Sequence, residues 1–429
     1  MARFGIGRGH IGLDIGTSAV RAAEVRGGQR PTVARFGQVL LPRGAVTDGE
    51  VQEPEIVAQA ITALWKRAGF SSRTVRIGVS NRRVVTRQIE LPAMAPADLE
   101  GAIRFQAQDY IPIPLSEAVM DYEVIEEITG AEGQALIRVL VVAAERAMVE
   151  PLLSAVRQAK LEAEVLELNA YPLMRALGSD MVSAAEVEAI VDVGGGVTNV
   201  VIHQAGKPRF TRMLPSLGGD DFTQAVAEAL DLEWEDAESL KHRASSLLGR
   251  QLGGEPQAEP LAPFTRPETE PFATGAPEDE EAEEDDFLGG LEPLHDEEPT
   301  DVLGTREPEP TFGQPEPLST PPVEGDVERA AEILQTVLQR FVGEVRGSVD
   351  FYTTQGDALP LGHVILSGGG ALLGGLSEQL SAALRVPVEV GRVFSRVPAA
   401  KVKLSQEEMA VAEPFLGVAV GLALGGLED

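Results

Sequence analysis

The chain has 429 residues, no cysteine, only five histidines and a formal net charge of −31 at pH 7. This length accommodates two or more domains, and the absence of cysteine excludes disulfides and thiolate metal sites. The few dispersed histidines argue against a histidine metal site, and the strong negative charge argues against nucleic acid as the main partner.

Neither a signal peptide nor a membrane span is expected. Residues 1–10 include Arg3 and Arg8, but no apolar core segment follows them. No run approaches the roughly 20 apolar residues that span a bilayer. The most apolar stretch, 415–424, predicts a buried terminal helix. We therefore expect a cytoplasmic protein.

The first predicted element is a hairpin over 11–25. An apolar strand ends at Asp14, and a turn of Gly16, Thr17 and Ser18 leads into a returning strand. Glycine lets backbone N–H groups approach an anion closely, although most glycine-rich hairpins are only hairpins. Asp14 would repel a phosphate, and a hydrated Mg²⁺ ion between the two would resolve that conflict.

The next elements predict a sheet that is covered by helices. A strand is expected over 32–41 and another over 74–79. Between them, a helix is expected from Pro54 to near Gly69, because proline favours the first turn and glycine the position just past the end. This order of strands and helix is typical of one half of a layered α/β domain.

Residues 84–160 interrupt this pattern. The expected elements are an extended segment over 84–91, a helix over 96–110, a proline-bounded turn over 111–115, strands over 119–128 and 135–144, and a helix over 145–160. Together they predict a small α+β domain inserted into the first half. A strand over 162–168 then returns to that half, and a short helix follows at 171–178.

A second hairpin repeats the pattern of the first. Its strand ends at Asp192, and its turn and returning strand contain Gly194, Gly195, Gly196 and Thr198. Near the end of the chain, a strand over 364–366 leads into Gly368, Gly369 and Gly370. Two such hairpins followed by a strand–glycine turn indicate an internal duplication with a ligand between the halves.

Helices and one biased segment complete the chain. Helices are expected at 218–230 and 234–248, and the second contains Glu238 and Lys241, for which a surface ion pair is the simplest interpretation. Residues 251–325 hold 21 acidic residues against two arginines and 14 of the 29 prolines, which predicts a disordered acidic linker. The last expected helices are 326–353, 373–384 and one near 414–424 that packs on the first half.

The order of these glycine loops resembles the actin-like ATPase superfamily, which includes actin, heat-shock chaperone ATPase domains, sugar kinases and the bacterial FtsA and PilM proteins. The resemblance implies an α/β fold in which two duplicated halves surround a nucleotide cleft, with a small inserted α+β domain and a disordered acidic insertion. It implies a first half at 10–85 and 160–188 with 408–429 packed on it, an insert at 86–159, a second half at 189–225 and 355–407, a helical lid at 226–250 and 326–354, and the linker at 251–325.

Three stretches of the insert are similar to the PilM family. Residues 90–94 contain the pattern L-P-x-M, and residues 120–124 resemble L-D-Y-x-V. Residues 102–114 resemble the pattern A-I-x-x-E-A-x-x-Y-I-P-x-P, with Gln106 where the family has a glutamate. With the glycine loops, the resemblance covers nearly the whole chain except the acidic linker.

The resemblance implies ATP and Mg²⁺ as ligands, with the metal held through water by Asp14 and Asp192. Arg21 aligns with a phosphate-contacting lysine of many relatives. Asn169 stands where relatives place a water-orienting glutamate or glutamine, and asparagine is no base at neutral pH, so hydrolysis is expected to be slow or absent. The residues expected to contact the nucleotide are Asp14, Gly16, Thr17, Ser18, Arg21, Asp192, Gly194, Gly195, Gly196, Thr198, Glu238, Lys241, Gly368, Gly369 and Gly370.

The function that this resemblance favours is a cytoplasmic ATP-binding scaffold of the type IV pilus or a related secretion machinery. It implies a PilN-like single-pass membrane protein as partner, whose cytoplasmic N-terminal peptide docks beside the insert and holds the scaffold at the inner membrane, and also the pilus motor ATPase complex. An FtsA-like cell-division protein is an alternative, although no basic amphipathic helix is visible at the end of the sequence. A metabolic kinase is another, but it needs a substrate-deprotonating aspartate in the cleft and no such insert.

Overall fold

The computed structural model describes residues 9–130, 133–179, 185–253, 324–356, 358–400 and 406–428. All of them belong to one compact unit. The acidic segment predicted over 251–325 lies outside the described residues from 254 to 323.

The first half is built on a five-stranded sheet in the order β10-β6-β1-β2-β3. Strands β1, β2 and β3 form an antiparallel meander. Strand β6 runs parallel to β1, and β10 runs parallel to β6. The strands are β1 (His10–Ile15), β2 (Ala19–Arg26), β3 (Thr32–Leu40), β6 (Thr74–Val79) and β10 (Glu162–Leu168).

The second half repeats this sheet, in the order β13-β12-β11-β14-β15. Its meander is again antiparallel, β14 runs parallel to β11, and β15 runs parallel to β14. The strands are β11 (Val187–Val193), β12 (Val197–Gln204), β13 (Lys207–Pro215), β14 (Leu361–Ser367) and β15 (Val388–Val390). The identical strand order and direction confirm the duplication predicted from the two hairpins.

One face of the first sheet is covered by α1 (Pro54–Ala68) and α3 (Arg146–Gln158). Helix α1 has proline in its first turn and ends at Gly69 in the left-handed conformation, as predicted. Helix α3 buries Leu152 and Val156 in the same core as Ile61 of α1. The helix expected to close the insert therefore packs on the first sheet.

The other face is covered by α4 (Ala170–Leu177) and α11 (Gly417–Gly425). Helix α11 lies so close to β1 that a Cβ atom at Gly12 would sit 2.0 Å from the carbonyl oxygen of Ala419. The same apolar layer includes Ile190 and Ile365 of the second sheet. A single core thus joins the two halves.

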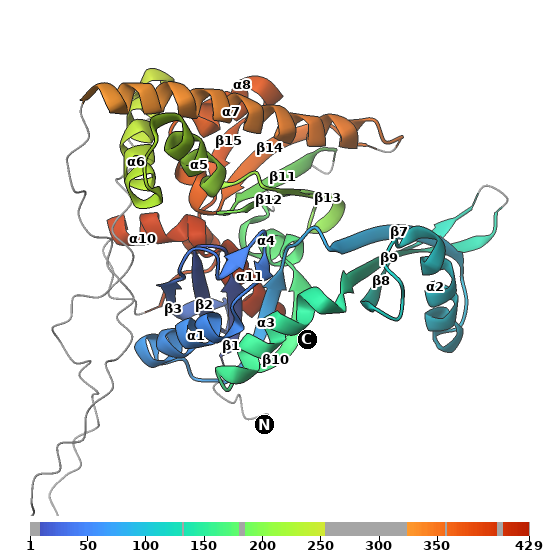
Figure 1. The fold of residues 1–429 in the computed structure, drawn as a ribbon. Helices are drawn as coiled ribbons and strands as arrows, with labels where there is room; N and C mark the ends of the chain where they lie inside the picture. Colours follow the sequence, from blue (N-terminus) through green and yellow to red (C-terminus); the bar gives the residue numbers. More distant parts are fainter. Residues whose placement is uncertain are drawn as a thin grey trace, which may run out of the picture. The chain divides into compact units, whose positions relative to one another are not determined.

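The second sheet carries α5 (Gly219–Leu230), α6 (Trp234–Gln251), α7 (Glu324–Thr353) and α8 (Leu376–Leu384). Figure 1 shows the long helix α7 running across α5 and α6. The ring centroids of Phe222 on α5 and Phe341 on α7 lie 6.1 Å apart in this core. The fully buried Leu334 and Leu338 continue the apolar face of α7 that its sequence predicts.

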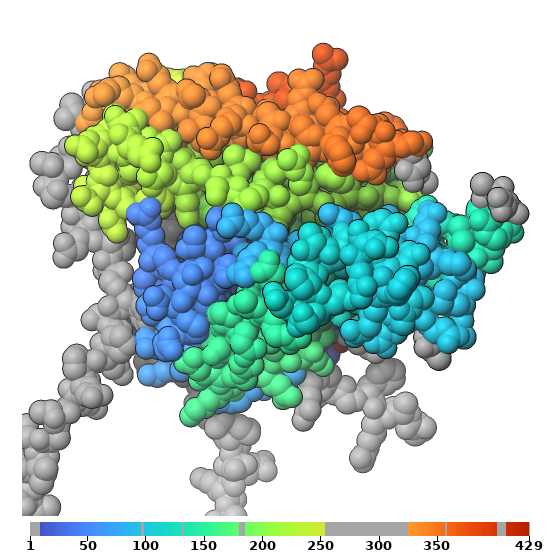
Figure 2. Space-filling model, turned by 45° about the vertical axis from the view of Figure 1, so that its right-hand side comes forward, coloured from blue at the N-terminus to red at the C-terminus, as the bar shows by residue number. Residues whose placement is uncertain are grey.

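The insert has a core of its own. Strands β7 (Val84–Pro92), β9 (Ala135–Glu145) and β8 (Ala118–Thr129) form an antiparallel sheet in that order, and α2 (Pro96–Tyr110) covers one face of it (Figure 1). Ile103 of α2 is fully buried against Leu91 and Val139 of the sheet. Figure 2 shows the cyan and teal surface of the insert beside the orange surface of α7.

The remaining elements are short. They are β4 (Val46–Thr47), β5 (Glu50–Val51), α9 (Val393–Arg396), α10 (Gln406–Ala412) and the 3-10 turns Gly369–Leu372 and Glu413–Phe415. Within the described residues, no helix combines the length and the apolar character needed to cross a membrane.

Candidate nucleotide site between the two halves

The two hairpins have the same local geometry. The N–H of Gly16 donates to the carbonyl of Ala19 at 3.0 Å, and that of Gly194 donates to Val197 at 2.9 Å. In the strand pairing of the first hairpin, Asp14 lies opposite Arg21. At the equivalent position of the second hairpin, Asp192 lies opposite Asn199. The duplication therefore places one aspartate at the end of the first strand of each half.

Asp14 and Asp192 lie close enough for the charge of one to act on the other. Burial raises the pKa of Asp14, the Arg21 guanidinium lowers it, and the Asp192 carboxylate raises it, with a net value of about 6. The Nη1 atom of Arg21 lies 3.7 Å from Oδ2 of Asp14. The two carboxylates thus meet in a desolvated place with one cation beside them.

Asp192 is held by polar neighbours of its own half. Burial raises its pKa, while hydrogen bonds from Ser367 and Asn199 act in the opposite direction. The Asn199 Nδ2 group lies 3.4 Å from Oδ2 of Asp192. Ser367 ends β14 directly beside Asp192 in the parallel register, so the second carboxylate is fixed from both neighbouring strands.

Two buried polar atoms at this edge of the first sheet have no hydrogen-bond partner among the described residues: Nε of Arg21 and Oδ1 of Asn169. Asn169 follows β10 and lies beside Gly78 of β6, where a Cβ atom would come within 2.3 Å of its Oδ1. Because buried polar atoms are normally paired, orphaned atoms of this kind point to a ligand or ordered water.

The two glycine turns touch each other. The N–H of Gly196 donates to the Thr17 hydroxyl at 3.3 Å, and a Cβ atom at Gly195 would lie 3.2 Å from Thr17 Cβ. Ser18 is exposed at the same turn, and its carbonyl accepts from Leu41 N–H at 2.9 Å. The structure thus brings together the residues predicted to bind phosphate from the two halves.

The second turn is fastened to the start of α5. Backbone N–H groups of Gly219 and Asp220 donate to the carbonyls of Gly194 and Gly195, both at 2.9 Å. The hydroxyl of Thr198 is buried and donates to the Leu217 carbonyl. The hydroxyl proton of Thr198 is therefore already used in a hydrogen bond to the loop that precedes α5.

The third glycine turn, residues 368–370, packs against the end of β11. Gly368 adopts a φ of +80°, and a Cβ atom there would sit 2.3 Å from the Val193 carbonyl, so only glycine fits. At Gly369 and Gly370 the nearest atoms to such a Cβ belong to Phe415 and Val193. All three residues lie beside the end of β11 that carries Asp192.

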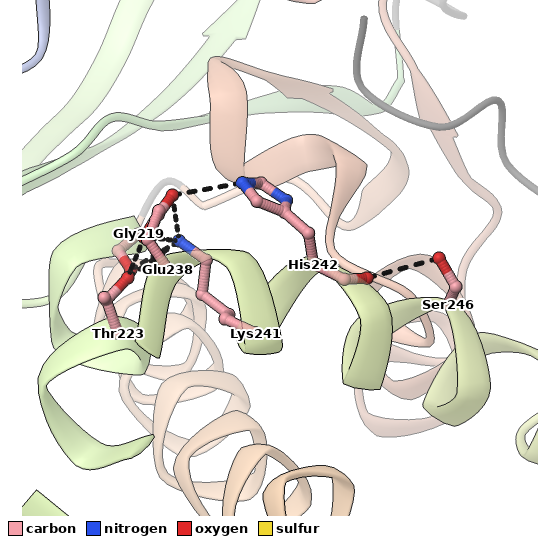
Figure 3. Close-up of polar contacts among 6 residues, drawn as sticks. All are labelled: Gly219, Thr223, Glu238, Lys241, His242 and Ser246. Atoms are coloured by element: carbon pink, nitrogen blue, oxygen red, sulfur yellow. Dashed lines mark hydrogen bonds and ion pairs between the residues drawn. The ribbon is translucent and has the colours of Figure 1, made fainter. Parts of the chain in front are cut away.

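Glu238 and Lys241 form a compact cluster on α6 rather than an isolated surface pair (Figure 3). The Lys241 Nζ atom is 2.7 Å from Glu238 Oε2, donates to the Thr223 hydroxyl at 2.8 Å and approaches the Gly219 carbonyl at 3.3 Å. Burial raises the pKa of Glu238, but His242 and Lys241 outweigh it and lower the value to about 2. The cluster therefore fixes α6 to the first turn of α5.

The donor set at the cleft suits a hydrated divalent cation. Across the residues that the structure describes, no three His, Cys, Asp or Glu side chains gather so that they alone could hold a metal ion. Asp14 and Asp192 supply only two carboxylates. Mg²⁺ retains several waters and binds through one or two carboxylates plus phosphate oxygens, so the pair fits Mg²⁺ bound together with a phosphate ligand.

Several residues beside the site were not predicted from the sequence. Asn199, Ser367, Asp220, Thr223 and Phe415 all contact predicted site residues. Asn199 alone had a sequence signal, because it occupies in the second hairpin the position of Arg21 in the first.

Two sheets of identical topology, with paired Asp–Gly hairpins facing each other, define the actin-like ATPase fold. The family model of the type IV pilus assembly protein PilM matches residues 12–270, and that of the cell division protein FtsA matches residues 189–421. The chain belongs to the PilM family.

The chain is also similar to a solved structure and to curated cell division proteins. A solved structure, the PilM-PilN type IV pilus biogenesis complex, superposes with a TM-score of 0.71 at 24% identity, covering 99% of this chain and 100% of that one. FtsA of Pseudomonas aeruginosa is 27% identical over 59% of this chain and 65% of its own length. FtsA of Bacillus subtilis is 23% identical over 54% and 57%. The chain thus spans about three fifths of these curated relatives.

Proposed function

We propose that this chain is an ATP-binding scaffold of type IV pilus assembly, located in the cytoplasm and held at the inner membrane by a PilN-like protein. The observation that carries the nucleotide half of this proposal is the meeting of the two Asp–Gly hairpins, whose turns touch at Thr17 and Gly196 next to Asp14 and Asp192. The Nε donor of Arg21, which has no partner among the described residues, supports a phosphate ligand. When bound, Mg²⁺ would neutralise phosphate charge, with Asp14 and Asp192 as its protein anchors.

The remaining predicted residues have corresponding roles in the proposal. The turns at Gly16 and Gly194 would present N–H donors to phosphates, and the Gly368 turn would flank the adenosine. Glu238 and Lys241 would contact the sugar only if part of their mutual cluster opened, since both are engaged with each other. We therefore expect these two residues to contribute less to nucleotide binding than the two aspartates.

Calorimetry of Mg·ATP binding tests the nucleotide site. The variants Asp14→Ala and Asp192→Ala should each weaken binding at least about tenfold, which corresponds to ~1.4 kcal/mol. Asp326→Ala is the matched control, because it removes the same charge from the exposed start of α7. Equal affinities for all four proteins would show that the site is elsewhere.

The partner half of the proposal concerns the insert. In α2, Phe105 and Tyr110 expose 74% and 53% of their surface, which is unusual for large apolar side chains. The following turn is anchored by buried Ile111 and Ile113, so the exposed Pro112 is held rigidly. A rigid apolar surface lowers the ordering cost of capturing an extended peptide. We propose that the cytoplasmic N-terminal peptide of a PilN-like protein docks beside the insert, close to residues 84–114, and contacts this surface of α2.

Fluorescence anisotropy with such a labelled peptide provides the test. Phe105→Ala and Tyr110→Ala should each weaken binding about tenfold or more, as loss of an aromatic anchor commonly does. Phe351→Ala removes an equally exposed aromatic from α7 and should have no effect. A chain lacking residues 86–144 loses the insert but keeps α3 on the first sheet. It should lose the peptide, and full binding by that chain would move the partner site to the second half.

An FtsA-like role is the second candidate, because the FtsA family model matches residues 189–421. That match does not include the insert, whereas the PilM match spans it completely. Failure of the peptide assay combined with self-assembly of the chain into filaments would favour the FtsA-like role.

A further inference from the structure

Arg21 is a cation that the chain itself places beside the two aspartates proposed above to hold Mg²⁺. Its side chain is only 12% exposed and lies 3.7 Å from Asp14. Its charge also acts on Asp192, from the other half of the molecule. The equivalent position in the second hairpin is a neutral residue, Asn199. The duplicated site therefore contains two carboxylates and one built-in positive charge.

The guanidinium is held in place without using all its donors. Its central carbon lies 5.3 Å from the centroid of the Phe415 ring, a cation–π distance that fixes the side chain at the cleft. The separation of 3.7 Å from Asp14 exceeds the usual N–H···O distance of about 2.7–3.2 Å. Together with the unpartnered Nε, this leaves donors available for an incoming anion.

These contacts give Arg21 a role that depends on the ligand. Two buried carboxylates near each other are costly unless a cation lies between them, and Arg21 supplies that cation when no ligand is bound. Building on the nucleotide site proposed above, we infer that Arg21 keeps Mg²⁺ away from Asp14 and Asp192 in the absence of nucleotide and yields to it only when nucleotide phosphates engage the Arg21 donors. Mg²⁺ and nucleotide then bind cooperatively. The phosphates draw the Arg21 guanidinium away from the two carboxylates, and Mg²⁺ replaces the positive charge that the carboxylates lose.

Calorimetry with MgCl₂ alone, on the full-length chain without nucleotide, tests this inference. The acidic segments will also take up Mg²⁺, so each protein is compared with its own Asp14→Asn derivative and only the difference is counted. Wild type should show no measurable Asp14-dependent site, whereas Arg21→Gln should gain one that is at least about tenfold tighter than any Asp14-dependent binding left in wild type. Arg21→Lys keeps the charge and should behave like wild type. Arg212→Gln, which removes an exposed charge from β13, is the control and should also match wild type.

A second measurement uses the wild-type protein alone. Wild-type affinity for ATP should rise at least about tenfold when EDTA is replaced by Mg²⁺, since linkage requires the same factor in both directions. The inference is overturned if wild type binds Mg²⁺ alone at Asp14 as tightly as Arg21→Gln does, or if neither protein shows an Asp14-dependent site. A chain that binds no nucleotide at all refutes the proposed function instead, while the MgCl₂ comparison still decides the role of Arg21.

Discussion

The guanidinium of Arg43 lies 3.8 Å from the centre of the Trp234 ring, and these two residues belong to opposite halves of the molecule. Arg43 also donates from Nη2 to Gln224 of α5 at 3.3 Å. The loop after β3 is thereby joined to the start of α6. The halves therefore contact each other here as well as at the glycine turns, Thr17 and Gly196, and in the shared apolar core.

Removing this cation–π contact should loosen the halves. We expect Arg43→Ala to shift the emission of Trp234 and to lower stability by about 0.5–1 kcal/mol, the range for exposed cation–π pairs. Trp65 is the only other tryptophan in the sequence, so Trp234→Phe identifies the signal that belongs to Trp234. Arg104→Ala, on the exposed surface of α2, is the control. An unchanged emission spectrum in Arg43→Ala would contradict this contact.

The packing of α11 on β1 gives a second prediction. A methyl group at Gly12 would overlap the Ala419 carbonyl at 2.0 Å and the Leu422 Cβ at 2.6 Å. Overpacking of this kind typically costs about 1–3 kcal/mol, so Gly12→Ala should lower the urea midpoint markedly. Gly343→Ala makes the same change inside α7, where nothing lies within 4 Å, and should stabilise the protein by up to about 1 kcal/mol. Equal midpoints for the two variants would show that α11 does not pack on β1 in this way.

A buried carboxylate in the second half predicts a pH dependence of stability. Glu188 is fully buried; burial raises its pKa, but the His203 ring 3.1 Å away and hydrogen bonds from His363 and the Ser179 N–H lower it to about 2. Since the unfolded side chain titrates near its ordinary value of about 4.3, the unfolded state binds more protons between these pH values. The stability contributed by Glu188 is therefore complete above about pH 4.5 and is lost as the pH falls toward 2.

His363 acts in the opposite direction at higher pH. The hydrogen bond to Glu188 raises its pKa, so its contribution is complete below its ordinary range and is lost as the pH rises through the raised value. Urea unfolding from pH 2 to 8 should show both trends in wild type. Glu188→Gln should flatten both, by roughly 2–3 kcal/mol at the acid end. Identical pH profiles for wild type and variant would contradict this account.

Much of the fold could be predicted from the sequence because the signals were local. The turn at Gly16, the proline start of α1 and the apolar face of α7 each follow from short-range chemistry. The placement of α3 could not be predicted, since whether Leu152 packs on the insert or on the first sheet depends on tertiary contacts. Phe415 reaches Arg21 from nearly 400 residues away in the sequence, and no periodic pattern reports such a contact.

The candidate site could also be predicted only in part. The sequence predicts Asp14 and Asp192 as a pair because the duplication repeats their surroundings. The commitment of Thr198 to the Leu217 carbonyl was not predictable, because Leu217 lies beyond the following strand, and only the folded β12–β13 hairpin brings the two together.

The last prediction concerns turnover. Asn169 follows β10, two strands from β1, and its buried Oδ1 has no partner among the described residues. An amide at this place could orient a water but could not remove its proton at neutral pH. We therefore expect ATP hydrolysis far below the typical enzyme rate of about 10 per second. ATP would then act mainly as a ligand that stabilises the closed cleft.

Single-turnover phosphate release measures this rate, with Asp192→Ala as the blank for contaminating ATPases. Asn169→Ala should leave the slow rate nearly unchanged, because no base is lost. Asn169→Asp has almost the same shape and adds a base, so it should raise the rate at least about tenfold, within the usual range for a positioned general base. Wild-type turnover near 10 per second that disappears in Asp192→Ala would show that the chain has a catalytic group other than the one expected at Asn169.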